Sequence, residues 1–85
     1  MDIKEVKKNI LEYDLYEVLD DIPYGNYSLT ILNGNYEIMI VVYDDQGFAS
    51  GTMDKEEFLN ISTNEELEQR INSILYYNYI EDEGE

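Results

Sequence analysis

The stretch that decides the fold is residues 27–43, YSLTILNGNYEIMIVVY. Apolar and polar side chains alternate through residues 27–32, as they do in a strand with one buried face. The dipeptide Asn33-Gly34 follows and favours a tight hairpin turn, because both residues tolerate positive φ angles. Residues 35–43 then form the returning strand. Since residues 38–42 are apolar at every position, we expect this strand to be the central one of the sheet.

One further strand is predicted downstream of the hairpin. Residues 44–47, DDQG, have the composition of a turn. Residues 48–53 predict a third, weaker strand, because Gly51 lowers the strand propensity there. We expect this strand to form an edge of the sheet.

A long helix is predicted upstream of the hairpin. Apolar residues recur at spacings of three and four in two overlapping stripes, which predicts a helix over residues 2–20. The residue before Pro23 is pushed toward extended geometry, so the helix should end there. Residues 23–26, PYGN, then predict a turn into the hairpin.

Two capping-box patterns predict helices downstream of the strands. Asp54 is followed three residues later by Glu57, and Thr63 is followed in the same way by Glu66. In this pattern each side chain accepts a hydrogen bond from the other residue's backbone N–H, which stabilises a helix start. The helices expected from the two patterns cover about residues 55–60 and about residues 64–80.

These elements predict a two-layer α+β domain, in the order helix, three-stranded antiparallel meander, helix, helix. Eighty-five residues are enough for one domain. We expect residues 1–80 to be compact and the acidic residues 81–85 to form a flexible tail.

Charge is the most unusual chemical property of the chain. It carries 20 Asp and Glu against 5 Lys and Arg, which gives a formal net charge of -15 at pH 7. No Lys or Arg occurs from Asn9 through Asp54. Because like charges repel in a compact protein, such an excess opposes folding and indicates a use. The use we expect is binding to a basic surface of a partner protein.

Several kinds of chemistry are disfavoured by the composition. The chain has no His and no Cys, so it lacks the commonest general base, disulfides and thiolate metal sites. An EF-hand with Gly47 at its glycine position would need Val42 and Met53 as ligands, and neither side chain can coordinate calcium. We therefore expect no enzymatic activity, no cofactor and no metal site.

The candidate partner-binding residues are carboxylates, turn amides and tyrosines. Carboxylates three or four residues apart on a helix lie about 6 Å apart, which is comparable with neighbouring phosphates on one DNA strand. The chain has nine tyrosines, a residue that is common at binding hot spots. The candidate set is Asp14, Glu17, Asp21, Asn33, Asn35, Glu37, Asp44, Asp45, Glu65, Glu68, Tyr76 and Tyr77.

In length, acidity, lack of cysteine and expected element order, the chain resembles the small acidic inhibitors encoded by phages, above all the anti-CRISPR proteins that act on type II effector nucleases. The resemblance covers architecture and charge and rests on no sequence motif. It implies a DNA mimic that occupies the basic cleft in which the nuclease reads a short flanking motif on duplex DNA. It also implies that Asp44-Asp45, the turn at Asn33-Gly34-Asn35 and Glu37 form the inhibitory surface. The chain resembles inhibitors of DNA glycosylases and of restriction enzymes nearly as closely.

Two other interpretations of the charge stay open. The chain could be an immunity protein or antitoxin that neutralises a basic nuclease toxin, or its carboxylates could serve only as a solvated surface. In the inhibitor and immunity interpretations the partner is a basic nucleic-acid-binding protein, with no direct contact to nucleic acid or membrane. The charged first residues and the absence of a long apolar run predict neither a signal peptide nor a membrane span. We expect a monomer in the cytoplasm, which is the host bacterial cytoplasm if a phage encodes it.

Overall fold

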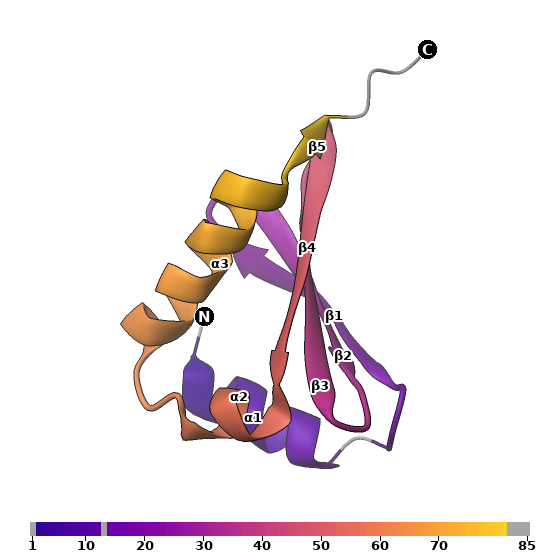
Figure 1. Ribbon diagram of the computed structural model, residues 1–85, viewed down its shortest axis with the longest axis vertical. Coiled ribbons are helices and arrows are strands. Elements are labelled where there is room, and N and C mark those ends of the chain that lie inside the picture. Colours follow the sequence, from indigo (N-terminus) through magenta and orange to yellow (C-terminus); the bar gives the residue numbers. More distant parts are fainter. Residues whose placement is uncertain (1, 13, 82–85) are drawn as a thin grey trace.

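The computed structural model describes residues 2–12 and 14–81. The strands form one antiparallel sheet with the order β1-β2-β3-β4-β5, and the helices all lie on the same side of it (Figure 1). This arrangement confirms the α+β class. The elements are α1 (Ile3–Glu12), β1 (Val18–Tyr24), β2 (Tyr27–Asn33), β3 (Glu37–Tyr43), β4 (Gly47–Asp54), α2 (Lys55–Asn60), α3 (Asn64–Asn78) and β5 (Ile80–Glu81).

The hairpin predicted from residues 27–43 is confirmed, but its turn is longer than the tight one expected, because neither Asn33 nor Gly34 has a positive φ and β3 begins at Glu37 instead of residue 35. β2 and β3 pair in continuous register from Ser28 opposite Tyr43 to Asn33 opposite Ile38. The turn needs glycine at position 34, because a Cβ there would collide with the carbonyl oxygen of Glu37. β3 is the middle strand of the sheet, as expected from its apolar run.

The core lies between the sheet and the helices. Alternate residues of β3 are fully buried, while the intervening ones are exposed or half-buried. Burying an aliphatic side chain of this size stabilises the fold by roughly 1.5–3 kcal/mol. The buried strand residues are Leu29, Ile31, Ile38, Ile40, Val42, Ala49 and Met53, and they face Ile3, Val6 and Ile10 of α1, Phe58 of α2, and Leu67 and Ile71 of α3.

The long first helix was a wrong prediction, because α1 ends at Glu12 and the second apolar stripe belongs to strand β1. A positive φ of 68° at Tyr16 breaks any helix before that strand. β1 pairs with the outer edge of β2. It therefore satisfies the backbone groups on that edge of β2, which would have no strand partner if residues 18–24 were helical. Pro23 fits in β1 because this is an edge strand, where a missing N–H is tolerated. The turn after it is shorter than predicted, because Tyr24 and Tyr27 already pair across it.

In the described part of the chain the sheet therefore has five strands where three were expected. The fifth, β5, is the short segment Ile80–Glu81, which pairs with Phe48 and Gly47 at the start of β4. β4 consequently is not an outer strand along its whole length, and α3 ends at Asn78 instead of about residue 80. The expected flexible tail began at residue 81, but Glu81 belongs to β5. Residues 82–85 lie outside the described residues.

The two helix starts differ in how they are capped. At α3 the predicted capping box forms in part, since Thr63 Oγ1 accepts from the Glu66 N–H at 3.2 Å, whereas the Glu66 carboxylate accepts from the N–H of Ser62, one residue before Thr63, at 3.2 Å. At α2 the Asp54 side chain makes no capping hydrogen bond. The Lys55 N–H instead donates to the Tyr36 carbonyl at 2.9 Å, which ties this helix to the β2–β3 turn. No helix within the described residues is long and apolar enough to cross a membrane.

Candidate binding surface

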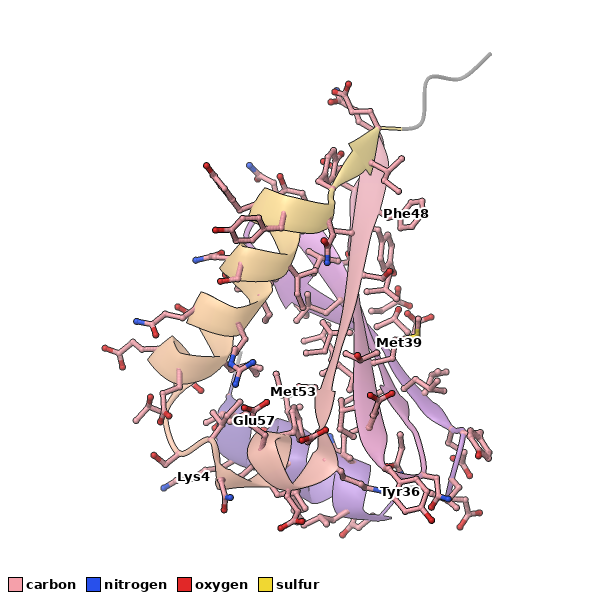
Figure 2. All side chains as sticks on the ribbon, viewed as in Figure 1. Lys4, Tyr36, Met39, Phe48, Met53 and Glu57 are labelled. Carbon is pink, nitrogen blue, oxygen red and sulfur yellow. The ribbon has the colours of Figure 1, made fainter. Side chains whose placement is uncertain are left out.

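No described helix covers the face of the sheet that points away from α1, α2 and α3. Figure 2 shows Met39 and Phe48 pointing away from the helices, whereas Met53 points toward them. We call this surface the open face. By strand register its residues are Val18, Asp20 and Pro23 of β1, Ser28, Thr30 and Leu32 of β2, Glu37, Met39, Val41 and Tyr43 of β3, Phe48, Ser50, Thr52 and Asp54 of β4, and Ile80 of β5.

Two apolar patches lie on the open face. The first patch is the cross-strand row Val18, Leu32 and Met39. Leu32 and Met39 line a depression of about 490 Å³ together with the exposed rings of Tyr16 and Tyr36. Val18 is 47% exposed and Met39 is 37% exposed, so both offer apolar area that the fold leaves in contact with water.

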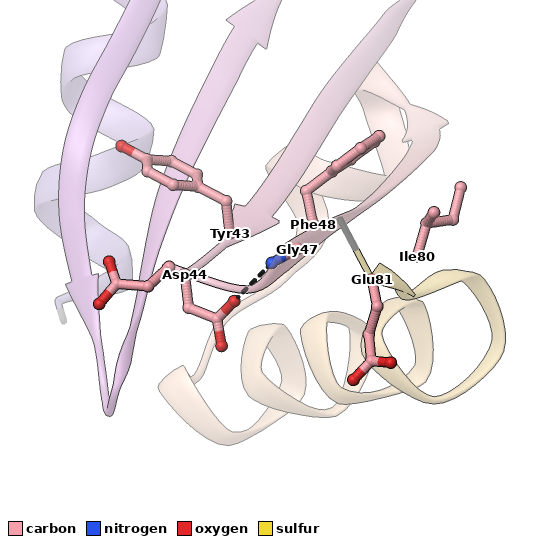
Figure 3. Close-up of a pocket in the computed structure, with 7 residues that line it drawn as sticks. Tyr43, Asp44, Gly47, Phe48, Ile80 and Glu81 are labelled. Atoms are coloured by element: carbon pink, nitrogen blue, oxygen red, sulfur yellow. Dashed lines mark hydrogen bonds between the residues drawn. The ribbon is translucent and has the colours of Figure 1, made fainter. Parts of the chain in front are cut away.

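The second patch is the cross-strand row Tyr43, Phe48 and Ile80. These three side chains point to the same side of the sheet and line a depression of about 450 Å³ (Figure 3). Phe48 is 44% exposed and Ile80 is 59% exposed. Asp44 and Asp45 also line this depression, so the apolar row has carboxylates at its border.

A pair of adjacent carboxylates is held in place where β1 bulges. Thr30 Oγ1 donates a short hydrogen bond to Asp20 Oδ1, and the Tyr43 hydroxyl donates to Asp21 Oδ1 at 3.1 Å. The bond from Thr30 is the main reason that the pKa of Asp20 is lowered below its usual value. The bond to Asp21 is the main reason that the pKa of Tyr43 is raised. These contacts favour the ionised form of Asp20 and hold Asp20 on the open face and Asp21 beside it.

The few cations belong to the helical layer. Lys7 Nζ of α1 donates to the carbonyls of Leu59 and Ile61 at 3.0 and 2.7 Å, and Arg70 of α3 pairs with Glu57 at 2.6 Å. Among the described residues this is the one ion pair within 4.0 Å. Figure 2 shows Lys4 and Glu57 on the helical side as well. The open-face carboxylates therefore have no ion-pair partner within residues 2–12 and 14–81.

The charge on one row of the open face directly opposes folding. Glu37 and Asp54 stand opposite each other in the β3–β4 register, and both are exposed. Like charges in directly opposed positions destabilise an antiparallel pair. Lys55, which follows this pair, directs its Nζ to the Gly34 carbonyl at 3.2 Å.

Asp14, Glu17 and Asp21 were expected at helical spacing, and this prediction was wrong because none of them lies on a helix. Asp14 and Glu17 precede β1, in a turn where the Glu17 N–H donates to the Asp14 carbonyl at 3.2 Å. Asp21 lies on β1 with a φ of 58°. Of these three residues, the structure places only Asp21 beside the open face.

Of the turn amides, Asn35 is exposed and Asn33 is not. Asn33 is 2% exposed, so its side chain is not available to a partner, contrary to its place in the candidate set. Its Nδ2 donates to the Asp14 carbonyl at 3.3 Å, and its backbone bonds to Tyr16 and Glu17. Asn33 therefore holds the segment before β1 against the hairpin. Asn35 lies at the end of the open face and lines the first depression.

The two turn acids Asp44 and Asp45 have different roles. The Asp44 carboxylate accepts from the Gln46 and Gly47 N–H groups, each at 2.9 Å, and from the Tyr79 hydroxyl at 2.7 Å. The bond from Tyr79 is the main cause of the lowered pKa of Asp44, and it raises the pKa of Tyr79 to about 12. Asp44 thus maintains the turn, whereas Asp45 is exposed.

The remaining candidates lie on the helical layer, away from the open face. Glu65 is exposed in the first turn of α3, and Glu68 is half-buried in the same helix. Tyr76 and Tyr77 are exposed near the end of α3, with their rings edge to face at 4.8 Å. The structure therefore brings Asp21, Asn35, Glu37 and Asp45 onto or around the open face, but not these four residues.

Sequence reasoning missed the apolar residues of the open face and Asp20. The signal was present, because residues 38–42 are apolar at every position. This run predicts the central strand, which is confirmed, but it does not show that Met39 and Val41 face away from the helices. Within residues 2–12 and 14–81 no three acidic side chains are grouped so that they could hold a metal ion.

The chain matches no protein-family model, no curated protein and no solved structure.

Proposed function

We propose that this protein is a non-catalytic inhibitor that acts as a DNA mimic. Its acidic open face and the adjoining turns occupy the basic nucleic-acid-binding cleft of a nuclease. The target that we propose first is a CRISPR effector nuclease. Such an inhibitor works in the cytoplasm, which is that of a bacterial host if a phage encodes the protein. It acts by steric and electrostatic occlusion, and therefore needs neither a catalytic residue nor a cofactor.

One observation carries this proposal: every Lys and Arg lies on a helix, whereas exposed acids occur on the strands as well. The strands carry exposed acids and no Lys or Arg, and the Lys and Arg side chains whose bonds are described above bond to backbone carbonyls or to Glu57. The facing acids Glu37 and Asp54 belong to paired strands, where opposed residues lie about 5 Å apart. This spacing is comparable with that of neighbouring phosphates on a DNA strand. Lys and Arg side chains arranged for phosphates can therefore meet carboxylates here.

The like-charge pair of Glu37 and Asp54 supports the same proposal. A sheet gains nothing from two carboxylates in directly opposed positions. Lys or Arg side chains of a basic partner neutralise these two carboxylates. Binding therefore relieves a repulsion that the free protein retains. Because opposite charges also steer the encounter, we expect association to be fast at low salt and slower as salt is added.

The two apolar patches favour a second candidate, an immunity protein that neutralises a basic nuclease toxin. Apolar side chains contribute binding free energy to a protein partner, which suits a long-lived toxin complex. Co-expression distinguishes the two functions. An immunity protein rescues cells from its toxin even when it binds away from the DNA cleft, whereas a DNA mimic must compete with DNA.

A competition experiment tests the proposal. A guide-loaded type II effector nuclease is mixed with labelled duplex DNA carrying its flanking motif, and fluorescence anisotropy reports DNA binding. The protein should displace the duplex at low salt, and Asp45→Lys should weaken this effect. Glu65→Lys is the matched control, because it makes the same change of charge on the helical layer. Equal potency of the two variants would place the inhibitory surface elsewhere.

A further inference from the structure

The open face exposes more apolar area than the imitation of DNA charge requires. The patches formed by Val18, Leu32 and Met39 and by Tyr43, Phe48 and Ile80 lie on the same face, with Val41 between them along β3. Contiguous exposed apolar area with a polar border is typical of a protein-binding surface. The carboxylates Asp20, Asp21, Glu37, Asp45 and Asp54 form that border.

Charge decides which kind of occupant this face can take. A second copy of the chain would bring another acidic open face against the first, so repulsion disfavours a homodimer through it. Nucleic acid and anionic membrane surfaces are repelled for the same reason. The complementary occupant is a protein segment that carries both apolar and Lys or Arg side chains.

The shape of the sheet favours a helical segment over an added strand. Strand addition requires a free, regular edge, and β1 interrupts its edge with Pro23 and with a bulge at Asp21, whose φ is 58°. At the other edge, β5 pairs with the start of β4, and Asn78 Nδ2 donates to the Ser50 carbonyl at 2.9 Å. A helix needs only a face. Met39 and Tyr43 are four residues apart on β3, which is about 13 Å. An α-helix covers that length in about nine residues, so apolar side chains at i, i+4 and i+8 would reach both patches.

We infer that the open face receives an amphipathic, basic α-helix of the partner protein. The helix lies along β3, its apolar stripe contacts Met39, Val41 and Tyr43, and its Lys and Arg side chains reach the carboxylates on either side. This inference rests on the proposed function and deepens it, because it names the part of the basic partner that the protein holds.

Two synthetic peptides of about 15 residues test the inference on the unmodified protein. Both contain the same leucines, lysines and alanines and are held helical by a side-chain bridge. In one peptide the leucines form a single stripe at every fourth position, and in the other they are dispersed around the helix. Binding is measured by fluorescence anisotropy and located by amide chemical-shift changes.

We expect the striped peptide to bind about tenfold more tightly than the dispersed one, with shifts concentrated in β3 and β4. Met39→Thr combined with Phe48→Thr should abolish this difference, while Leu11→Gln, at an exposed position of α1, should keep it. Equal affinity of both peptides would overturn the inference and leave the attraction for basic surfaces intact. If neither peptide binds at low salt, the proposed function itself fails. Shifts confined to α3 would also overturn the inference.

Discussion

The Tyr79 hydroxyl donates a 2.7 Å hydrogen bond to the carboxylate of Asp44. This bond joins the segment that leads into β5 to the turn between β3 and β4, and the same carboxylate also accepts from two N–H groups of that turn. Asp44 therefore has a structural role, whereas the adjacent Asp45 is exposed. Substituting both acids together would therefore mix a loss of stability with a loss of binding.

Single substitutions should separate the two roles. Asp44→Asn weakens the bonds to Gln46, Gly47 and Tyr79, and we expect it to lower the thermal midpoint by about 5 °C. Asp45→Lys should leave the midpoint unchanged or raise it, because it removes one exposed like charge. Thermal unfolding followed by circular dichroism measures both. Equal midpoints for the two variants would show that the Asp44 bonds contribute nothing to stability.

Alkaline pH should weaken the Tyr79–Asp44 contact. The pKa of Tyr79 is raised from 10.0 to about 12 in the folded protein, chiefly by its bond to Asp44. The unfolded chain therefore releases this proton first as pH rises, so the stabilisation is present below pH 10.0 and is lost as pH approaches about 12. Urea unfolding across this range should show a smaller decline for Tyr79→Phe than for the unmodified protein. Parallel declines would contradict the assignment.

Added salt should stabilise the free protein. With a net charge of -15 and one ion pair within the described residues, screening reduces repulsion more than it weakens attraction. The thermal midpoint should rise by several degrees when NaCl is increased from about 0.01 to about 0.5 M. Sucrose serves as an uncharged additive for comparison. A midpoint that stays flat or falls would mean that the carboxylates are already well separated.

Glu37 and Glu65 should respond in opposite ways to charge reversal. Glu37→Lys replaces the repulsion with Asp54 by attraction, so it should stabilise the fold by about 0.2–1 kcal/mol and weaken binding to the basic partner. Glu65→Lys removes an acid from the first turn of α3, so it should destabilise the fold slightly and leave partner binding intact. Denaturant unfolding and anisotropy titrations measure the two effects. Loss of stability in Glu37→Lys would argue against the like-charge interpretation.

The hairpin of residues 27–43 could be predicted because its signals are local: alternation, the Asn33-Gly34 turn and a continuous apolar run. The starts of α2 and α3 were predictable for the same reason, although Asp54 makes no capping bond. The segment of β1 could not be predicted, because pairing with β2 outweighs its helix-like periodicity. β5 depends on two residues that pair with β4 only after α3 has ended.

The candidate surface was predictable in composition but not in arrangement. The lack of cations from Asn9 through Asp54 identified the acidic region before any fold was known. Which strand acids are exposed on one face depends on strand register, and this is why Asp20 was missed. Asn33 and Asp44 proved structural because they bond to segments distant in the sequence, at Asp14 and Tyr79. The apolar patches depend on the absence of a covering layer among the described elements, which no local pattern encodes.

The most direct test of the DNA-mimic proposal is whether the protein and duplex DNA exclude each other on the same partner. The partner is captured from a bacterial lysate at low salt and purified, and its affinity for labelled duplex DNA is measured at increasing concentrations of the protein. We predict that the apparent Kd for DNA rises in proportion to the concentration of the protein, and that Glu37→Lys reduces this effect about tenfold while Glu65→Lys does not. An unchanged Kd, with the protein and DNA bound to the partner together, would contradict the proposal.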